Sequence, residues 1–158
     1  MGYLRAAPSF IAVLLCTACA GVGAGPLLCT EMGAEPGISV TVAENMAQSA
    51  EAAMLEVCDD GCRTYELELR PGSETVDLGC DSSEPEGSCS GEVRPNGTLV
   101  GFVVIEQLPD HELEVAILAG GERYSALGTP EPVYPNGPDC PGSALQLSIT
   151  LDNGALTA

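Results

Sequence analysis

The sequence contains no lysine and no tryptophan, and its only permanently positive side chains belong to five arginines. Against them stand 23 aspartate and glutamate residues, so the formal net charge is -18. Proteins that bind nucleic acid depend on lysine and arginine contacts to phosphate, and a chain this acidic is repelled by polyanions and anionic lipid. We therefore predict that nucleic acid is not a partner.

Aromatic residues are also scarce, with two phenylalanines and four tyrosines in the whole chain. A hydrophobic core in this protein must therefore be aliphatic and consist of Val, Leu, Ile and Ala. The long apolar run near the N-terminus falls short of the roughly 20 residues that a membrane-spanning helix needs. A transmembrane span is not expected from this run.

The N-terminal residues have the pattern of an export signal that ends at a lipid-attachment site. Arg5 supplies the positive region, residues 6–15 supply the hydrophobic run, and Ala18 is the small residue at the cut. These are the three parts of a signal peptide, and in bacterial lipoproteins the cut falls just before a cysteine that carries a diacylglyceryl group. We predict that Cys19 is that lipidated cysteine.

This interpretation divides the chain into three parts. Residues 1–18 form the signal peptide, residues 19–28 form the lipid anchor and a short tether, and residues 29–158 form a single β-sandwich domain, since this length suits one domain and not two. The alternative is an ordinary secretory signal that is cut after Ala20. With lipidation, the protein lies on the outer face of the cell membrane and contacts the membrane through its anchor.

The cysteines are consistent with export to an oxidising compartment. Cys16 leaves with the signal and Cys19 takes the lipid, which leaves an even number for disulfides. Six cysteines allow fifteen connectivities, but the spacing favours one, in which one pair brackets a tight turn, another brackets a polar loop and the last joins the two ends. The predicted pairs are Cys58–Cys62, Cys80–Cys89 and Cys29–Cys140.

Apolar and polar residues alternate in several segments, which is the pattern of a half-buried strand. Such strands are predicted in residues 38–42, in both arms of a hairpin from about 53 to 69, and in residues 113–117 and 145–151. Residues 99–105 are apolar on both sides and are therefore predicted to form a central strand, and residues 124–127 form the returning strand after a tight Gly120-Gly121 turn. Glycine and proline turns separate them, as in β-sandwiches. We predict an all-β fold, namely a disulfide-stapled, immunoglobulin-like β-sandwich of about seven short strands.

Two segments are less clear. Alanines and methionines in residues 43–57 fall at helical spacing. A hairpin that enters the turn at Asp59-Asp60-Gly61, however, accounts for both of its arms and for the cysteine pair. We therefore predict only a short helical turn near residues 44–49. Residues 71–94 are rich in turn-forming residues and are predicted to be mostly loop, with one edge strand around residues 75–78.

Several motifs together resemble those of a known group of proteins. They are residues 29–34 followed by 37–40, the hairpin of residues 55–65 with its two cysteines, and the loop of residues 134–140. In these motifs, and over most of the mature chain, the sequence is similar to a group of actinobacterial secreted lipoproteins. The resemblance implies a location in the cell envelope and a compact domain, and no particular activity follows from it.

One motif suggests catalysis. Gly87-Ser88-Cys89-Ser90-Gly91 has the outline of a nucleophile elbow, which in an α/β-hydrolase lies between a strand and a helix. Neither flanking element is predicted, and His111 is the only histidine that could act as a base. We interpret Cys89 as a disulfide cysteine and His111 as a solvated residue beside a turn, so no catalytic residue is predicted.

Metal binding has two possible sites. Cys58 and Cys62 could ligate zinc, but a second ligand pair with zinc-site spacing is absent, and a disulfide is the simpler interpretation in an exported chain. Acidic side chains could bind calcium, which takes six to eight oxygen ligands. These are Asp59, Asp60, Asp81, Glu84 and Glu86. They form no known calcium-loop pattern, so we predict neither a metal nor a cofactor.

Three classes of function follow from these observations. The favoured one is a lipid-anchored, non-catalytic module that binds an unidentified protein of the cell envelope. The others are a structural envelope lipoprotein, which only spaces or solvates the surface, and a hydrolase-type enzyme. An exposed apolar patch would favour the binding module, whereas close carboxylates in a concave pocket would favour the enzyme.

Overall fold

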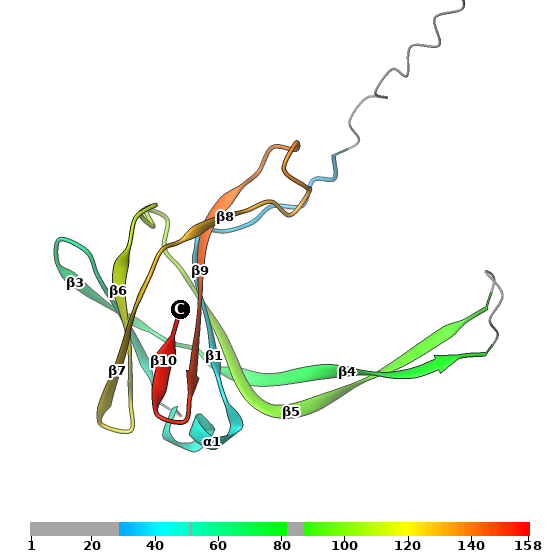
Figure 1. Cartoon of the computed structure of the whole chain (residues 1–158), viewed down its shortest axis with the longest axis horizontal. Helices are drawn as coiled ribbons and strands as arrows, with labels where there is room; N and C mark the ends of the chain where they lie inside the picture. Colours follow the sequence, from blue (N-terminus) through cyan, green and yellow to red (C-terminus); the bar gives the residue numbers. More distant parts are fainter. Residues whose placement is uncertain (1–28, 51, 82–86) are drawn as a thin grey trace, which may run out of the picture.

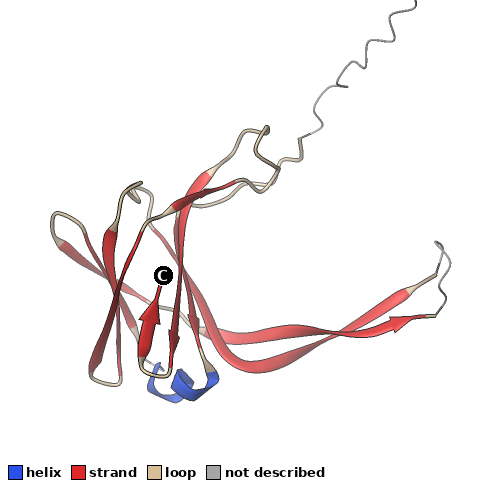
Figure 2. Ribbon diagram, viewed as in Figure 1, coloured by secondary structure: helices blue, strands red, loops and turns tan. Residues whose placement is uncertain are grey.

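The computed structural model describes residues 29–50, 52–81 and 87–158. The predictions for the signal peptide, Cys19 and the tether lie outside the described residues, as do those for Glu84 and Glu86. The described chain is an all-β sandwich of two packed sheets with one short helical segment (Figure 2). The predicted all-β sandwich class is confirmed, and its immunoglobulin-like type stays a prediction.

Ten strands are found in the described residues, rather than about seven. They are β1 (Gly37–Val42), β2 (Met54–Cys58), β3 (Cys62–Glu66), β4 (Arg70–Cys80), β5 (Cys89–Val104), β6 (Leu113–Ala119), β7 (Glu122–Gly128), β8 (Glu131–Val133), β9 (Ala144–Asp152) and β10 (Ala155–Thr157). Between β1 and β2 lie the helix α1 (Glu44–Ala47) and the 3-10 turn η1 (Gln48–Ala50). The short helical turn and the β2–β3 hairpin are both as predicted.

The first sheet, sheet A, has the strand order β10-β9-β1-β5-β4, and β8 also pairs with β9. Within it β1 runs antiparallel to β5 and parallel to β9, so the first strand and a strand near the C-terminus lie side by side (Figure 1). The second sheet, sheet B, has the order β3-β2-β6-β7 and is antiparallel throughout. The parallel pair joins two segments of sheet A that lie more than 100 positions apart in the sequence.

The core lies between the two sheets and is aliphatic, as the scarcity of aromatic residues predicts. Sheet A contributes Ile38, Val40, Val42, Leu147, Ile149 and Leu151. Sheet B contributes Leu55, Val57, Leu113, Val115 and Ile117. Every second residue of these strands is buried, because side chains alternate between the two faces of a sheet. No polar or charged residue is buried in the part of the chain that the structure describes.

The largest difference from the prediction lies in residues 71–94. Strands β4 and β5 continue past the sandwich as a long two-stranded ribbon (Figure 1). We use the name ribbon for residues 73–80 and 89–96. The prediction that this segment is mostly loop is therefore wrong, whereas the predicted edge strand at residues 75–78 lies within β4, at the edge of sheet A. The rest of the ribbon shows no strand pattern in the sequence, because an extension that packs on nothing has no buried face, and the alternation of apolar and polar residues that marks a strand arises from such a face.

Three disulfides form in the structure. They are Cys29–Cys140, Cys58–Cys62 and Cys80–Cys89, the same pairs that the spacing predicts. Cys58 lies opposite Cys62 in the register of β2 and β3, and Cys80 lies opposite Cys89 in the ribbon. The Cys29–Cys140 disulfide links residues 111 positions apart, with 5.7 Å between their Cα atoms. It ties the segment before β1 to the loop before β9.

Candidate functional site

The outer face of sheet A is uncharged over its three central strands. It consists of the residues of β1, β5 and β9 that alternate with the core residues and pair across the strands in register. They are Ser39, Thr41, Val100, Phe102, Val104, Gln146, Ser148 and Thr150. The side chains of Val100, Phe102 and Val104 are exposed by 37%, 36% and 47%. In a chain with 23 acidic residues, a charge-free face with an apolar row is the clearest departure from the average surface.

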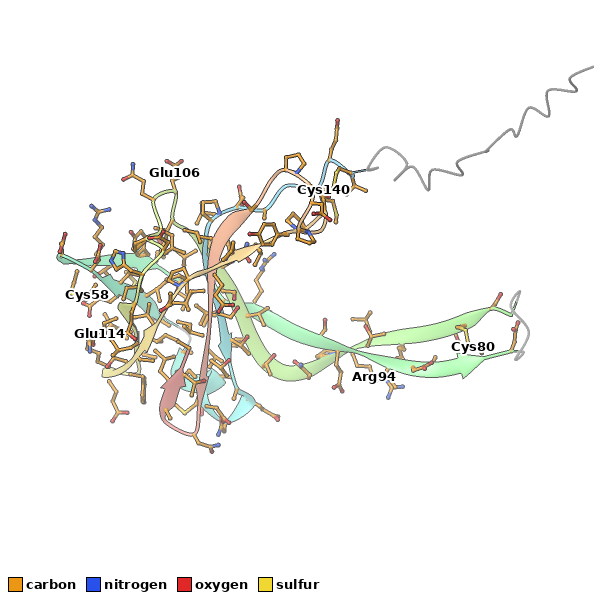
Figure 3. All side chains as sticks on the ribbon, turned by 45° about the horizontal axis from the view of Figure 1, so that its top comes forward. Cys58, Cys80, Arg94, Glu106, Glu114 and Cys140 are labelled. Atoms are coloured by element: carbon orange, nitrogen blue, oxygen red, sulfur yellow. A yellow bond between two sulfur atoms is a disulfide. The ribbon has the colours of Figure 1, made fainter. Side chains whose placement is uncertain are left out.

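The outer face of sheet B, on the opposite side of the molecule, carries charged side chains. On the outer side of sheet B, Arg123 of β7 donates from Nε to Glu56 Oε1 and from Nη2 to Glu114 Oε1, both at 3.0 Å. The hydrogen bond to Glu56 and then that to Glu114 raise the pKa of Arg123. This exposed network joins three strands of sheet B. Figure 3 shows Glu114 on the side of the sandwich that lies away from the ribbon.

A pocket of about 580 Å³ lies at one end of the uncharged face. We call it the Phe102 pocket. Phe102 reaches it from β5 and Gln146 from β9, while residues 33–35 and 133–135 form its other walls. Its volume falls in the range of roughly 300 to 1,000 Å³ that small-molecule and side-chain sites occupy. Its lining is mixed: the aromatic rings of Phe102 and Tyr134 lie beside the polar residues Glu35 and Gln146.

The pocket walls are held together by contacts between distant segments. The Cys29–Cys140 disulfide joins the segment before β1 to the loop after β8. Asn136 donates from Nδ2 to the Met32 carbonyl oxygen at 2.7 Å. Gln146 donates from Nε2 to the Glu35 carbonyl oxygen at 2.8 Å. These three links fix the shape of the pocket, because they cross between its two walls.

Gly37 permits the position of the Phe102 ring. A Cβ atom at residue 37 would lie 2.2 Å from the Val103 carbonyl oxygen and 2.8 Å from Phe102 Cζ. Both distances are far below van der Waals contact, so a larger residue would displace the ring and the strand next to it. Glycine at this point of β1 therefore allows β5 and its aromatic side chain to approach closely.

Sequence reasoning did not single out Phe102 or Tyr134. One signal is present in the sequence, since Val100, Phe102 and Val104 give β5 a second apolar face, whereas the matching positions of β1 are Thr, Ser and Gly. That second face was interpreted as burial in a central strand. The structure leaves it partly exposed.

The residues considered for catalysis do not come together. Cys89 begins β5 and its Sγ atom is bonded to that of Cys80 on the ribbon. His111 lies instead beside the β2–β3 turn, where its Nε2 atom is 2.9 Å from Asp59 Oδ1. In Figure 1 the β2–β3 turn and the end of the ribbon lie on opposite sides of the molecule. The strand–helix context of a nucleophile elbow is also missing, because Cys89 is followed by a strand.

The candidate metal ligands that the structure describes also lie in separate parts of the molecule. Glu56, Cys58 and Cys62 lie within ligand distance of one another, but the two sulfur atoms are joined in a disulfide and offer no thiolate. Asp59 and Asp60 line a second cavity of about 480 Å³ beside the β2–β3 turn, and both are exposed. Asp81 lies at the end of the ribbon, where its carboxylate accepts from Ser88 N. Of the acidic residues considered for calcium, the three that the structure describes, Asp59, Asp60 and Asp81, therefore do not come together at one site.

His111 should titrate above its ordinary value. The hydrogen bond to Asp59 raises the pKa of His111, and the charges of Asp59, Asp110 and Asp60 add to the effect. A raised pKa in the folded state means that protonation favours folding. This contribution is full below the unfolded value of about 6.5 and is lost as the pH rises through the folded pKa.

We expect the Asp59→Asn variant to lower the pKa of His111 toward its ordinary value, measured by NMR titration of the single histidine ring. Glu131→Gln, which removes a carboxylate from β8 on the other sheet, serves as the control and should leave the titration unchanged. An unchanged pKa in Asp59→Asn would contradict the assigned cause.

In the described residues, neither α1 nor η1 has the length and hydropathy that crossing a membrane requires. Comparison with protein-family models, with curated proteins and with solved structures finds no match to the chain. The geometry of the Phe102 pocket and of the uncharged face is therefore the basis for the functional assignment.

Proposed function

We propose that this protein is a lipid-anchored, extracytoplasmic binding module without catalytic activity, which contacts an envelope protein through the Phe102 pocket and the uncharged outer face of sheet A. The observation that carries the proposal is a pocket with two aromatic rings and a single carboxylate, that of Glu35, beside the uncharged central strands of sheet A in a highly acidic chain. The proposal also relies on the lipid-attachment pattern at Cys19.

The composition of the face favours contact with a protein partner. The centres of protein interfaces are depleted in charge and enriched in aromatic residues, and exposed apolar surface of this kind marks interaction sites. Phe102 and Tyr134 are exposed by 36% and 45%, although the core of the domain is aliphatic. Aromatic residues that stay outside an available core are suited to binding.

The titratable groups favour binding over catalysis. Catalytic acids and bases have pKa values shifted by burial and by charged neighbours in a cleft. The described residues bury no titratable side chain. The pKa is raised in His111, Arg123 and Tyr124, and each of these side chains is paired with a carboxylate. The first two are at least 40% exposed and Tyr124 is partly buried. Such surface pairs are structural contacts.

The position of the pocket suits a partner near the membrane. Cys29 is bonded to Cys140, and the segment that follows it forms one wall of the pocket. If Cys19 carries the lipid, the ten residues from Cys19 to Cys29 span at most about 35 Å when fully extended. The pocket would then be held close to the membrane surface, together with its partner.

The proposal is tested by capture from native membranes with the intact lipoprotein. We expect a defined partner to bind the wild type and to be lost from the Phe102→Ser/Tyr134→Ser variant. Truncation of aromatic residues at the centre of an interface costs about 2 kcal/mol or more, which is roughly a thirtyfold loss of affinity.

The matched control is Leu127→Ser, which removes another exposed apolar side chain, at 63% exposure, from β7 of sheet B, away from the pocket. It should capture the partner as well as the wild type does. Thermal melts check that both variants fold. Equal capture by both variants would contradict the assigned face, and the absence of any partner would favour a structural spacer.

A further inference from the structure

The ribbon has no role in the proposed binding to the Phe102 pocket, and it is a separate feature of the fold. We propose that it is a second interaction surface, which binds an extended, positively charged segment of another protein by adding it as a further β-strand.

The ribbon contributes nothing to the core. In residues 73–80 and 89–96 every side chain is exposed except that of Val76, which is partly buried. Leu78 and Val93 are exposed by 57% and 68%. Figure 3 shows Cys80 and Arg94 on the ribbon, well away from the sandwich. The stability of the domain therefore does not explain why the ribbon exists.

A disulfide keeps the ribbon closed at its far end. An isolated two-stranded hairpin is only marginally stable in water. Here Cys80 and Cys89 face each other in register and are bonded at the end of the two strands. The covalent link holds in place a surface that packing does not hold, which preserves its shape for contact with another molecule.

Both edges of the ribbon are open. β4 is the last strand of sheet A, and among the described strands it pairs only with β5. β5 pairs with β1 through residues 99–104, so its ribbon residues 89–96 have a neighbour on one side only. Unpaired backbone N–H and C=O groups along a strand edge are a template for another strand. The geometry therefore selects an extended segment as the occupant.

The charge of the ribbon selects a cationic segment. Its acidic residues are Glu74, Asp77 and Glu92, and its one cation, Arg94, is paired with Glu92 at 2.6 Å. Glu74 lies opposite Arg94 in the register, and Asp77 accepts from Gly79 N at 2.7 Å. The chain carries a net charge of -18, so a second copy of the ribbon would meet like charge with like charge. A strand rich in Lys or Arg meets no such repulsion.

The test uses the folded protein and three synthetic peptides about eight residues long. The first alternates lysine with valine, the second replaces each lysine by glutamate, and the third keeps the lysines but replaces the valines by proline, which has no N–H to donate. We expect only the first to bind, measured by fluorescence anisotropy, and to slow hydrogen exchange of the ribbon amides. Binding should weaken as salt rises.

Charge reversal locates the site. Exposed ion pairs each contribute little, so Glu74→Lys/Glu92→Lys, which replaces two attractions by two repulsions, should weaken binding of the first peptide by roughly tenfold. The control is Glu106→Lys/Glu131→Lys, which makes the same charge change outside the ribbon and should bind as the wild type does.

Three results would overturn the inference. Equal binding of the valine and proline peptides would indicate charge attraction without strand addition. Equal loss in both variants would indicate attraction to the whole acidic surface. No binding of the first peptide, with self-association seen by sedimentation instead, would make a second copy the occupant. Because the Phe102→Ser/Tyr134→Ser variant keeps the ribbon, it should bind this peptide normally, which separates the two proposals.

Discussion

Replacing Cys29 and Cys140 together by serine is expected to lower the free energy of unfolding by about 2 to 5 kcal/mol, the usual cost of removing a native disulfide from a small secreted domain. The two cysteines lie 111 positions apart. In the unfolded chain their link closes a very long loop, and the chain-entropy model assigns about 4.7 kcal/mol to a loop of about 100 residues. A typical domain has only about 5 to 15 kcal/mol in total.

The matched control is the double substitution of Cys58 and Cys62, which are 4 positions apart. They face each other in a hairpin that backbone pairing already holds, so their loss should cost clearly less. Urea unfolding of both double variants ranks the two effects. A larger loss in the Cys58/Cys62 variant would contradict the entropic explanation, and peptide mapping without reduction that linked Cys29 to another cysteine would contradict the pairing itself.

The Cys19→Ser variant is expected to move the protein from the membrane pellet to the soluble fraction. The reason is that one lipidated cysteine is the only feature of the sequence that we expect to hold a chain of net charge -18 at a membrane. Two-chain lipid modification gives stable anchoring, whereas a single acyl chain binds weakly. Cell fractionation together with incorporation of labelled palmitate measures the effect.

A serine at Cys16 is the control for this experiment. Cys16 lies inside the predicted signal peptide, so its replacement should leave the protein in the pellet with its label. Labelled palmitate in the Cys19→Ser variant, with the protein still in the pellet, would show that the anchor was assigned to the wrong residue. A wild type that is soluble and unlabelled would instead favour the secretory signal cut after Ala20.

Several strands of the sandwich could be predicted because each of them has one buried face. In β1, Ile38, Val40 and Val42 alternate with Ser39 and Thr41, and the first three are buried while the other two face outward. The same rule identified β6 and β9. Two of the disulfide pairs followed from short spacing, and the third followed from the two cysteines that were left.

The candidate site could not be predicted in the same way. Phe102, Tyr134 and Gln146 come from three separate segments, and they meet only because β1 lies between β5 and β9. The parallel pairing of β1 with β9 joins strands more than 100 positions apart in the chain. No local pattern encodes such a pairing, since a strand with one apolar face can pair with many others.

The sequence by itself determined an acidic, aliphatic, all-β domain with three disulfides, because charge, core composition and strand periodicity are properties of single residues and their near neighbours. Only the tertiary structure decided where the Phe102 pocket lies and that β4 and β5 extend as an exposed ribbon. The pocket depends on contacts between distant segments. The ribbon has no buried face, so its strands rest on backbone hydrogen bonds and one disulfide, and backbone hydrogen bonds leave little trace in the pattern of side chains.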